Sequence, residues 1–313
     1  INKTRSRGRL PHAYLFHGPA HVGKLTVAIT LAQSFFCLDA KQHDIRSVCG
    51  VCRTCRAIAE YRDPNVIILD TEHTLTSKKE SRKEIPIEDI RELKRILSFA
   101  PQGNAMRLAI INEADKMSEE AANAFLKLLE EPGSRTLIIL ITSSRDLLLP
   151  TIVSRTQLIG FSTVADNDMR MILRALRPAA HEDDKELLAL AGGRPGILVQ
   201  LCNDASYAAE EQSLFRNIQQ IIHSRDMLLA LRISEQAAND PARRENVISY
   251  IFMNLRHALI HPQVNNSSVH IARALTHVDR IAHVIDSTNV NPRLGLDVIF
   301  LECMKLPLNT RPI

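Results

Sequence analysis

The chain has 313 residues, of which 45% are apolar and 24% are charged, so it is long enough for two or three domains with a sizeable core. Its net charge of +4 is compatible with nucleic acid nearby but does not require it. Aromatic residues make up only 4% and tryptophan is absent, which argues against a surface that stacks on bases. The longest apolar runs, such as residues 137–141, are too short to span a membrane, and we expect no secretory signal before the first strand. We therefore expect a cytoplasmic protein.

The first diagnostic stretch is a glycine-rich loop between an apolar run and an amphipathic segment. Residues 14–16 are apolar, Gly18, Gly23 and Lys24 follow with the spacing G-x4-G-K, and residues 25–36 have helical periodicity. Strand, loop and helix in this order form a phosphate-binding loop, in which backbone N–H groups, the helix N-terminus and the lysine all attract an anion. The alternative is a tight strand-to-helix turn that binds nothing.

The residue after Lys24 argues against a magnesium site at this loop. A loop that holds Mg²⁺ places Ser or Thr directly after the lysine, because that hydroxyl ligates the metal. Here this position is Leu25, and Thr26 lies one residue further on, rotated by about 100° around the helix. We expect Gly18, Gly23, Lys24 and Thr26 to form a degenerate nucleotide site that binds ATP or ADP weakly or not at all.

Four of the six cysteines, Cys37, Cys49, Cys52 and Cys55, fall within nineteen positions. Two C-x2-C steps share Cys52, and together with the earlier cysteine they give the spacing of a small four-thiolate zinc module. In a cytoplasmic protein such a cluster more often binds metal than forms disulfides. Four thiolates fill every position of a tetrahedral ion, so we expect a structural zinc. Free thiols and redox chemistry are the alternatives.

A second strand and a second amphipathic helix follow the cysteines. Residues 65–69 are apolar and predict a strand, and residues 71–84 are polar with mixed charge and predict a mobile loop. Residues 85–97 have helical periodicity, with Ile90, Leu93 and Leu97 on the face that we expect to point inward.

The second diagnostic segment is residues 107–115. Its apolar run 108–111 predicts a buried strand, and Asn112 and Glu113 come directly after it, at the edge of the sheet where the phosphate loop also lies. A hydrolysing site has Asp and then Glu here, the first for the magnesium shell and the second to polarise the attacking water. Asn112 carries no negative charge, so the magnesium site is weakened a second time. Asp115 is two residues late and is expected to cap or contact the following turn.

The next segments complete the pattern of alternating strands and helices. Ser118 is the expected N-cap of an apolar-faced helix that ends at Pro132, and a strand at 136–141 and a short strand ending at Phe161 follow. Such alternation, with strands that are apolar throughout, predicts a parallel sheet covered on both faces. The expected fold class is therefore α/β, with a P-loop nucleotide-binding domain that carries a zinc module.

Beyond residue 161 the sequence predicts helices alone. Helices at 166–177, 183–191 and 197–203 indicate a small helical domain, and further helices include 247–259, 271–285 and 296–303. We expect domain boundaries at 1–162, 163–205 and 206–313. Cys202 and Cys303 lie in apolar helical contexts and are expected to be buried.

With these segments in place, the chain resembles the clamp-loader branch of the AAA+ ATPases, and within it the delta-prime subunit family of bacterial DNA polymerase III. The likeness rests on residues 9–18, the four-cysteine insert, and residues 121–132, 149–155 and 291–296. The Ala-Asn-Ala…Leu-Glu-Glu-Pro helix at 121–132, together with the cysteine insert, is specific to this group. The resemblance implies an AAA+ domain of the RecA-like type, a helical lid and an all-α collar.

The resemblance also implies a place in a five-subunit ring. In such a ring, gamma/tau ATPase subunits and a delta subunit act with it to load a sliding clamp on primed DNA. Delta-prime-like subunits usually do not hydrolyse ATP but offer the arginine of a Ser-Arg-Cys motif to a neighbour's ATP. Here the motif is Ser154-Arg155-Thr156, so Arg155, with Ser154 beside it, is the candidate catalytic residue in trans. Thr156 replaces the cysteine of the motif.

The lid region contains a further departure from hydrolysing relatives, which carry an arginine shortly after a glycine there. This chain has Gly196 at that position and Arg194 two residues earlier. Together with Leu25 and Asn112, this makes three compromised parts of a site for its own ATP, so we expect no ATP hydrolysis by the chain alone. An active gamma-type clamp-loader ATPase, and a zinc-bearing P-loop adaptor outside replication, are the alternatives.

Overall fold

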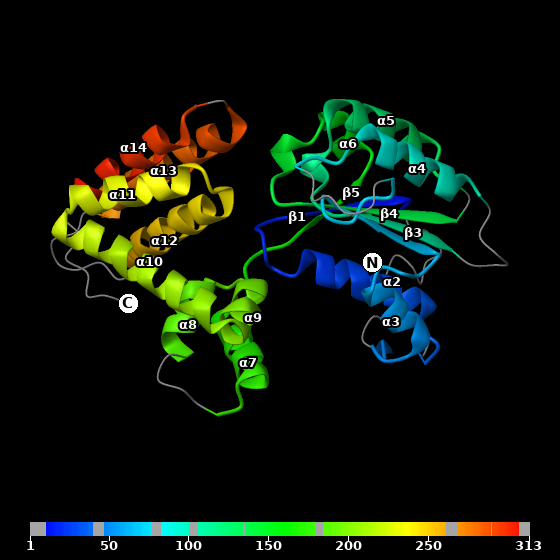
Figure 1. Ribbon diagram of the computed structural model, residues 1–313, viewed down its shortest axis with the longest axis horizontal. Helices are drawn as coiled ribbons and strands as arrows, with labels where there is room; N and C mark the ends of the chain where they lie inside the picture. Colours follow the sequence, from blue (N-terminus) through cyan, green and yellow to red (C-terminus); the bar gives the residue numbers. More distant parts are fainter. Residues whose placement is uncertain are drawn as a thin grey trace. The chain divides into compact units, whose positions relative to one another are not determined.

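The described part of the computed structural model comprises residues 11–39, 47–76, 83–99, 106–133, 135–179, 184–260, 268–288 and 290–306 (Figure 1). The chain divides into two compact units, residues 1–163 and residues 164–313. Arg9 and Leu10 of the motif at 9–18, residues 77–82 of the expected polar loop, and Asp183 lie outside the described residues. The expected division of the second unit into a lid and a collar stays a prediction.

The first unit contains a five-stranded parallel sheet, as the alternating sequence pattern predicted. Its strand order is β2-β3-β4-β1-β5. The first four strands in chain order are short apolar runs, and every strand begins or ends within two residues of the expected position. The strands are β1 (Ala13–His17), β2 (Val66–Leu69), β3 (Arg107–Ile111), β4 (Thr136–Thr142) and β5 (Gln157–Gly160).

The register of the sheet fixes what lies around the glycine-rich loop. Strand β1 lies between β4 and β5, and its last residue, His17, is paired with Thr142 and with Gly160. The loop after β1 therefore starts between the carboxyl ends of these two strands. Strand β3, which leads to Asn112, lies one strand further away, beyond β4.

Helices cover both faces of this sheet (Figure 1). On one face α2 (Lys24–Phe36) and α3 (Arg53–Ala59) pack on the alternate side chains Tyr14 and Phe16. On the other face α4 (Ile87–Ser98), α5 (Glu119–Glu130) and α6 (Pro150–Ser154) pack on Ala13 and Leu15. The expected two-sided cover of the sheet is thus confirmed, whereas α3 and α6 are short helices that the periodicity of the sequence did not predict.

Helix α4 confirms the expected inward face and corrects the expected start. Ile90, Leu93 and Leu97 are all buried in the core between α4, α5 and the sheet. The helix begins at Ile87, after Pro86, because Ile85 forms a parallel bridge with Met117 instead. The expected N-cap of α5 is confirmed as well, since the Ser118 hydroxyl accepts a hydrogen bond from the backbone N–H of Ala121 at 3.2 Å.

The secondary-structure elements in the described part of the second unit are all helices. One hydrophobic cluster runs through it, from Met169 in the first of these helices to Leu306 after the last one. The helices are α7 (Asp166–Leu176), α8 (Asp184–Ala191), α9 (Pro195–Asn203), α10 (Ala205–Ser224), α11 (Met227–Ala238), α12 (Pro241–Ile260), α13 (Ser268–Ser287) and α14 (Pro292–Met304). Among the helices that the structure describes, none has both the length and the apolar stretch that a membrane crossing requires.

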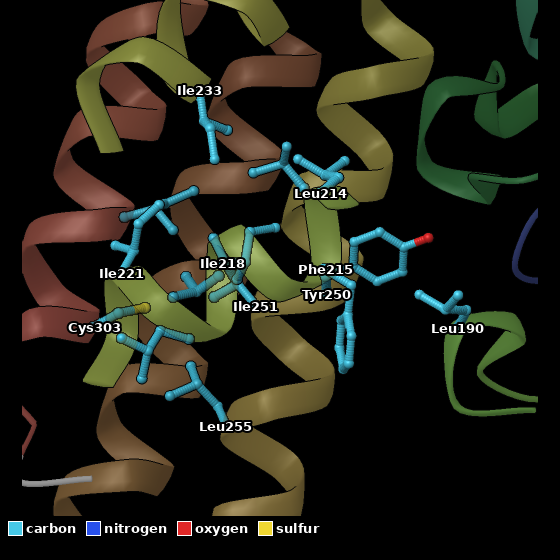
Figure 2. Packing of buried hydrophobic residues seen from close by; sticks show 14 of the residues in the cluster. Leu190, Leu214, Phe215, Ile218, Ile221, Ile233, Tyr250, Ile251, Leu255 and Cys303 are labelled. Carbon is cyan, nitrogen blue, oxygen red and sulfur yellow. The ribbon is translucent and has the colours of Figure 1, made fainter. Parts of the chain in front are cut away.

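Part of this core is shown in Figure 2, where side chains of α10 and α12 pack together. The rings of Phe215 and Tyr250 meet edge to face, with their centroids 5.5 Å apart. Cys303 is fully buried in the same cluster, and this burial raises the pKa of its thiol to about 12. Cys202 is only partly buried, so the expectation of burial is confirmed for Cys303 and holds in part for Cys202.

Candidate phosphate-binding and metal sites

The glycine-rich loop joins β1 to α2 through two glycines with positive φ. Gly23 has φ 94° and is the N-cap of α2, so that Lys24 is the first residue of the helix. Gly18 has φ 138°, and a Cβ atom there would lie 2.1 Å from the carbonyl oxygen of Phe161. Both positions favour glycine, the first for its conformation and the second also for its close approach to the chain after β5.

Lys24 is folded back onto this loop. Its side chain is largely buried, and Nζ donates to the carbonyl oxygens of Gly18 and Pro19, each at 2.6 Å. These contacts confine the ammonium group to the loop, where a phosphate-binding lysine belongs. An incoming phosphate would have to compete with the two carbonyls for the lysine.

The next two residues of α2 show what the departure from the magnesium-binding pattern does to the structure. Leu25 is partly buried and packs on the cluster between α2 and the sheet. Thr26 is exposed. The position that would carry the metal-binding hydroxyl is thus filled by a packing residue.

The polar residues after β3 lie at the carboxyl edge of the sheet. The backbone N–H of Asn112 donates to the carbonyl of Leu69 at 2.8 Å, which extends the pairing of β3 with β2. Glu113 has φ 54°, and its carboxylate accepts hydrogen bonds from the Thr71 hydroxyl at 2.9 Å and from Lys116 Nζ at 2.8 Å. Glu113 stands at the position of the glutamate in a hydrolysing site, and its carboxylate is already hydrogen-bonded to two neighbouring side chains.

Asp115 lies elsewhere than expected. Instead of contacting the following turn, its carboxylate accepts a hydrogen bond of 2.5 Å from the hydroxyl of Thr142, the last residue of β4. Thr142 is buried, and its hydroxyl also accepts from the backbone N–H of Ser144 at 3.1 Å. Since Thr142 is paired with His17, this contact brings a carboxylate toward the start of the glycine-rich loop. Thr142 and Thr71 were not predicted as parts of the site, although Thr142 is the polar residue that ends an apolar strand.

Arg155 follows α6 and is exposed. Its Nη2 donates to Glu130 Oε1 at 2.8 Å, and its Nη1 donates to the backbone carbonyl of Thr151 at 3.1 Å. The hydroxyl of Ser154 donates to the same carbonyl, also at 3.1 Å. The guanidinium group is thus held at the surface by the last residue of α5 and by α6.

The position that was expected in a lid, with glycine in place of arginine, lies at the start of α9. Gly196 is the second residue of this helix and contributes no side chain. Arg194, the N-cap of the helix, is buried, and its guanidinium donates to the carbonyl of Ala191 at 3.2 Å and to the hydroxyl of Ser249 on α12 at 3.3 Å. Arg194 therefore binds α12 within the second unit.

The four clustered cysteines come together as their spacing predicted. Cys37 ends α2 and Cys52 is the N-cap of α3, and the four sulfur atoms all lie within 4.8 Å of one another. The sulfur of Cys49 is 3.5 Å from that of Cys37 and 4.0 Å from that of Cys55. A tetrahedral zinc with Zn–S bonds of about 2.3 Å separates its sulfurs by about 3.8 Å. The cluster therefore has the dimensions and the donor set to hold a metal ion.

The surroundings of the cysteines suit a metal site as well. The backbone N–H of Cys55 donates to the sulfur of Cys52 at 3.4 Å and lowers the pKa of Cys52 to about 6, so that the thiolate that binds metals forms readily. Burial raises the pKa of Cys55, the innermost of the four, so this thiol gives up its proton less readily than Cys52 does. Gln33 of α2 donates to the Cys55 carbonyl at 2.9 Å and ties the cysteine-bearing segment to the sheet-covering helix.

A parallel sheet with a lysine-bearing glycine loop after its first strand, and with polar residues at the ends of the neighbouring strands, defines a P-loop-type α/β protein. Residues 1–165 match the protein family described as DNA polymerase III, delta subunit. The chain belongs to this family.

Individual relatives agree with the family. The DNA polymerase III subunit delta' of Pseudomonas aeruginosa is 33% identical over 190 residues, which are 60% of this chain and 55% of that protein. The subunit delta' of Bacillus subtilis is 34% identical over 213 residues, 67% of this chain and 56% of that protein. The gamma/tau subunit of Mycobacterium tuberculosis is 32% identical over 166 residues, 53% of this chain and 27% of that protein. The chain thus spans little more than half the length of the delta' relatives, and the resemblance found in the sequence motifs is confirmed.

Proposed function

We propose that this protein is a non-hydrolysing subunit of the DNA polymerase III clamp loader, which acts in the cytoplasm as a stator beside ATP-hydrolysing subunits. The family and the delta' and gamma/tau relatives support a clamp-loader role. In this proposal the first unit is an AAA+ domain with a degenerate nucleotide site, α7 to α9 form the lid, and α10 to α14 form the collar. ATP or ADP binds weakly or not at all.

The stator proposal rests on one observation. Residues at the positions that would bind magnesium or activate water instead pack in the core or bond to neighbouring side chains. Leu25 packs on the core where a magnesium-binding hydroxyl would stand, and Asn112 replaces a carboxylate. Glu113 is engaged by Thr71 and Lys116, so its carboxylate is not free to orient a water molecule. Each of these features lowers the affinity for Mg·ATP or the rate of its hydrolysis, and all act in the same direction.

Arg155 is the residue through which we propose that the chain takes part in catalysis. It is exposed, its guanidinium is fixed by Glu130 and Thr151, and its planar fork suits a phosphate. In a ring it would reach the γ-phosphate bound to a neighbouring subunit and stabilise the charge that develops during transfer. The hydroxyl of Ser154 donates to the same Thr151 carbonyl as Arg155 and so helps to fix the backbone next to the arginine.

The proposed partners are gamma/tau ATPase subunits and a delta subunit in a five-subunit ring, and through that ring the sliding clamp and primed DNA. Helix α14 supports an assembly role, because Leu294, Val298 and Leu301 form an exposed stripe at helical spacing. These residues are 60%, 44% and 40% exposed, respectively.

We assign the four cysteines to a structural zinc, because the donor set is all thiolate and leaves no open coordination position.

ATP turnover tests this proposal, first with the chain alone and then in a ring reconstituted with gamma/tau and delta subunits, the clamp and primed DNA. The chain alone should show no turnover near the rate of about 1 per second that is ordinary for enzymes. Arg155→Ala should leave the ring assembled but lower its DNA-stimulated turnover and clamp loading, and Arg155→Lys should restore little. Arginine fingers contribute roughly 10³–10⁵ in rate at their own site, and the whole ring will lose less because other sites remain.

The control for this experiment is Arg145→Ala, which removes another exposed arginine of the same unit. Equal losses in Arg145→Ala and Arg155→Ala would show a general effect of surface charge. Clamp loading by the Arg155→Ala ring at the unmodified rate would refute the action in trans.

An active gamma-type ATPase is the second candidate, and the contact between Asp115 and Thr142 favours it. This contact places a carboxylate one hydrogen bond from the strand end that is paired with His17. If Asp115 replaced the missing magnesium ligand, the chain alone would hydrolyse ATP and Asp115→Asn would abolish that activity. Turnover by the chain alone that depends on Asp115 would thus overturn the stator proposal.

A further inference from the structure

The cysteine cluster carries the two most exposed large hydrophobic side chains among the described residues of the first unit. Leu38 is 74% exposed and Val51 is 64% exposed, whereas the next in this unit, Phe99, is 56% exposed. A structural metal site needs its thiolates, but it does not need aliphatic side chains in water. Their placement on so small a module therefore calls for a reason other than the stability of the module.

The clustered cysteines bind the backbone at both of these residues. Leu38 follows Cys37, and its backbone N–H donates to the sulfur of Cys52. Val51 precedes Cys52, and its backbone N–H donates to the sulfur of Cys49. Because the four sulfurs lie within 4.8 Å of one another, the two peptide groups are fixed around a single small cluster.

Two arginines lie on the same module. Arg53 and Arg56 are exposed and stand three residues apart on α3, so their side chains project from one side of this helix. Arg62, which follows this helix, forms an ion pair with Glu60. Arg53 and Arg56 take part in no ion pair with another described residue. Asp39 is exposed and follows Leu38. Its negative charge would repel the charge of an anionic partner, so that charge would lie over the arginines of α3 and not beside Asp39.

We infer that Leu38, Val51, Arg53 and Arg56 form a docking surface, here called the cysteine-module patch, for an acidic peptide segment of a partner protein that also carries aliphatic side chains. The two guanidinium groups match carboxylates, and the two aliphatic side chains match Leu, Ile or Val on the partner. The inference does not depend on ATP binding or on Arg155.

The side chains of the patch favour a protein segment over single-stranded nucleic acid. The two arginines alone could pair with phosphates. The patch has no aromatic side chain on which a base could stack, and its two aliphatic residues gain nothing from a sugar–phosphate backbone. A peptide uses all four residues at once.

The test measures the binding of three labelled probes to the full chain with its metal bound, by fluorescence anisotropy at moderate salt. The first probe is a short peptide with Glu and Leu spaced at helical intervals, the second has Ser in place of every Leu, and the third is an oligothymidine. The first probe should bind roughly tenfold more tightly than the second. A Leu38→Ser/Val51→Ser variant should abolish this difference, and an Arg53→Ser/Arg56→Ser variant should weaken both peptides.

Matched controls separate the patch from general surface effects. Leu147→Ser removes another exposed aliphatic side chain of the same unit, and Arg62→Ser removes the paired arginine of the module, so both should bind the first probe as the unmodified chain does. Metal content and the circular dichroism spectrum should be unchanged in every variant. Equal affinity for the two peptides, no measurable peptide binding, or tighter binding of the oligothymidine would each overturn the inference.

Discussion

Arg155 and Glu130 form an ion pair that joins the end of α5 to the residue after α6, with Nη2 and Oε1 2.8 Å apart. The second Nη of the arginine donates to the Thr151 carbonyl, so the guanidinium is held by two acceptors. The side chains are 39% and 53% exposed, and an exposed pair of this kind contributes about 0–1 kcal/mol to stability. The contact therefore serves the orientation of the arginine more than the stability of the fold.

The first prediction concerns Glu130. If Arg155 acts in trans as proposed, Glu130→Ala should lower the DNA-stimulated ATP turnover of a reconstituted ring, because the guanidinium would be held on one side only and would reach the neighbour's phosphate less often. The loss should be smaller than that in Arg155→Ala, and the melting temperature of the chain should stay the same. In an Arg155→Ala background, Glu130→Ala should have no further effect on turnover.

The control is Glu131→Ala, which removes the same charge from the adjacent, exposed residue. Turnover by the Glu131→Ala ring should equal that of the unmodified ring. Full activity of the Glu130→Ala ring would mean that this ion pair has no part in positioning Arg155.

The second prediction compares the effects on stability of substituting Gly18 and Gly23 in the glycine-rich loop. Gly18→Ala should destabilise the first unit by roughly 2 kcal/mol or more, because the new Cβ would clash with the Phe161 carbonyl in addition to straining φ. Gly23→Ala has open space within 4 Å, so its cost should be the backbone strain alone, about 1–2 kcal/mol. Urea unfolding, monitored by hydrogen exchange in peptides from β1, measures the destabilisation caused by each substitution. Equal destabilisation by the two variants would contradict the close approach at Gly18.

Patterns that are local in sequence predicted most of the first unit. The apolar runs gave the strands to within two residues, and the spacing of Ile90, Leu93 and Leu97 gave the buried face of α4. The C-x2-C spacing gave the approach of Cys49, Cys52 and Cys55, because such turns bring sulfurs together locally, whereas Cys37 joins them from the end of α2. These features depend on neighbours in the sequence, so one sequence suffices to predict them.

Contacts between distant segments were not predictable in the same way. The sequence shows Asp115 and Thr142 as separate polar residues, and only the order of β3 and β4 in the sheet brings them within 2.5 Å. Likewise, Glu130 and Arg155 are 25 residues apart and meet because α5 and α6 pack on the same face of the sheet. Periodicity gives the buried side of a helix, but it does not give the partner of a polar side chain.

The third prediction concerns the metal. Protein purified without chelator should contain one zinc per chain, because the four thiolates match a single tetrahedral ion. Removal of the metal, or Cys52→Ser, should loosen α3 and the end of α2 and raise hydrogen exchange there, while the sheet keeps its protection. Cys202→Ser is the control, since this cysteine lies in α9, outside the cluster. A Cys52→Ser variant with unchanged zinc content and exchange would refute the site.

The last prediction concerns a buried polar contact between two helices of the second unit. The hydroxyl of Tyr250 on α12 donates to Glu211 Oε2 on α10 at 2.5 Å, and Asn246 donates to the other carboxylate oxygen at 3.0 Å. Tyr250 and Glu211 are both buried, so the carboxylate cannot replace a lost donor freely with water. Burial, followed by the bond to Glu211, raises the pKa of Tyr250 well above its usual value, so the hydroxyl keeps its proton at any ordinary pH.

Tyr250→Phe should therefore destabilise the second unit by about 1–3 kcal/mol, because it leaves one oxygen of a buried carboxylate without its donor. Tyr14→Phe is a matched control, since the Tyr14 hydroxyl is buried without a hydrogen-bond partner among the described residues, and its removal should be neutral or slightly stabilising. Hydrogen exchange resolved by mass spectrometry, in peptides from α10 and α12 for one variant and from β1 for the other, measures each unit separately. If the two substitutions cost the same, the bond between Tyr250 and Glu211 contributes nothing beyond the loss of a hydroxyl group.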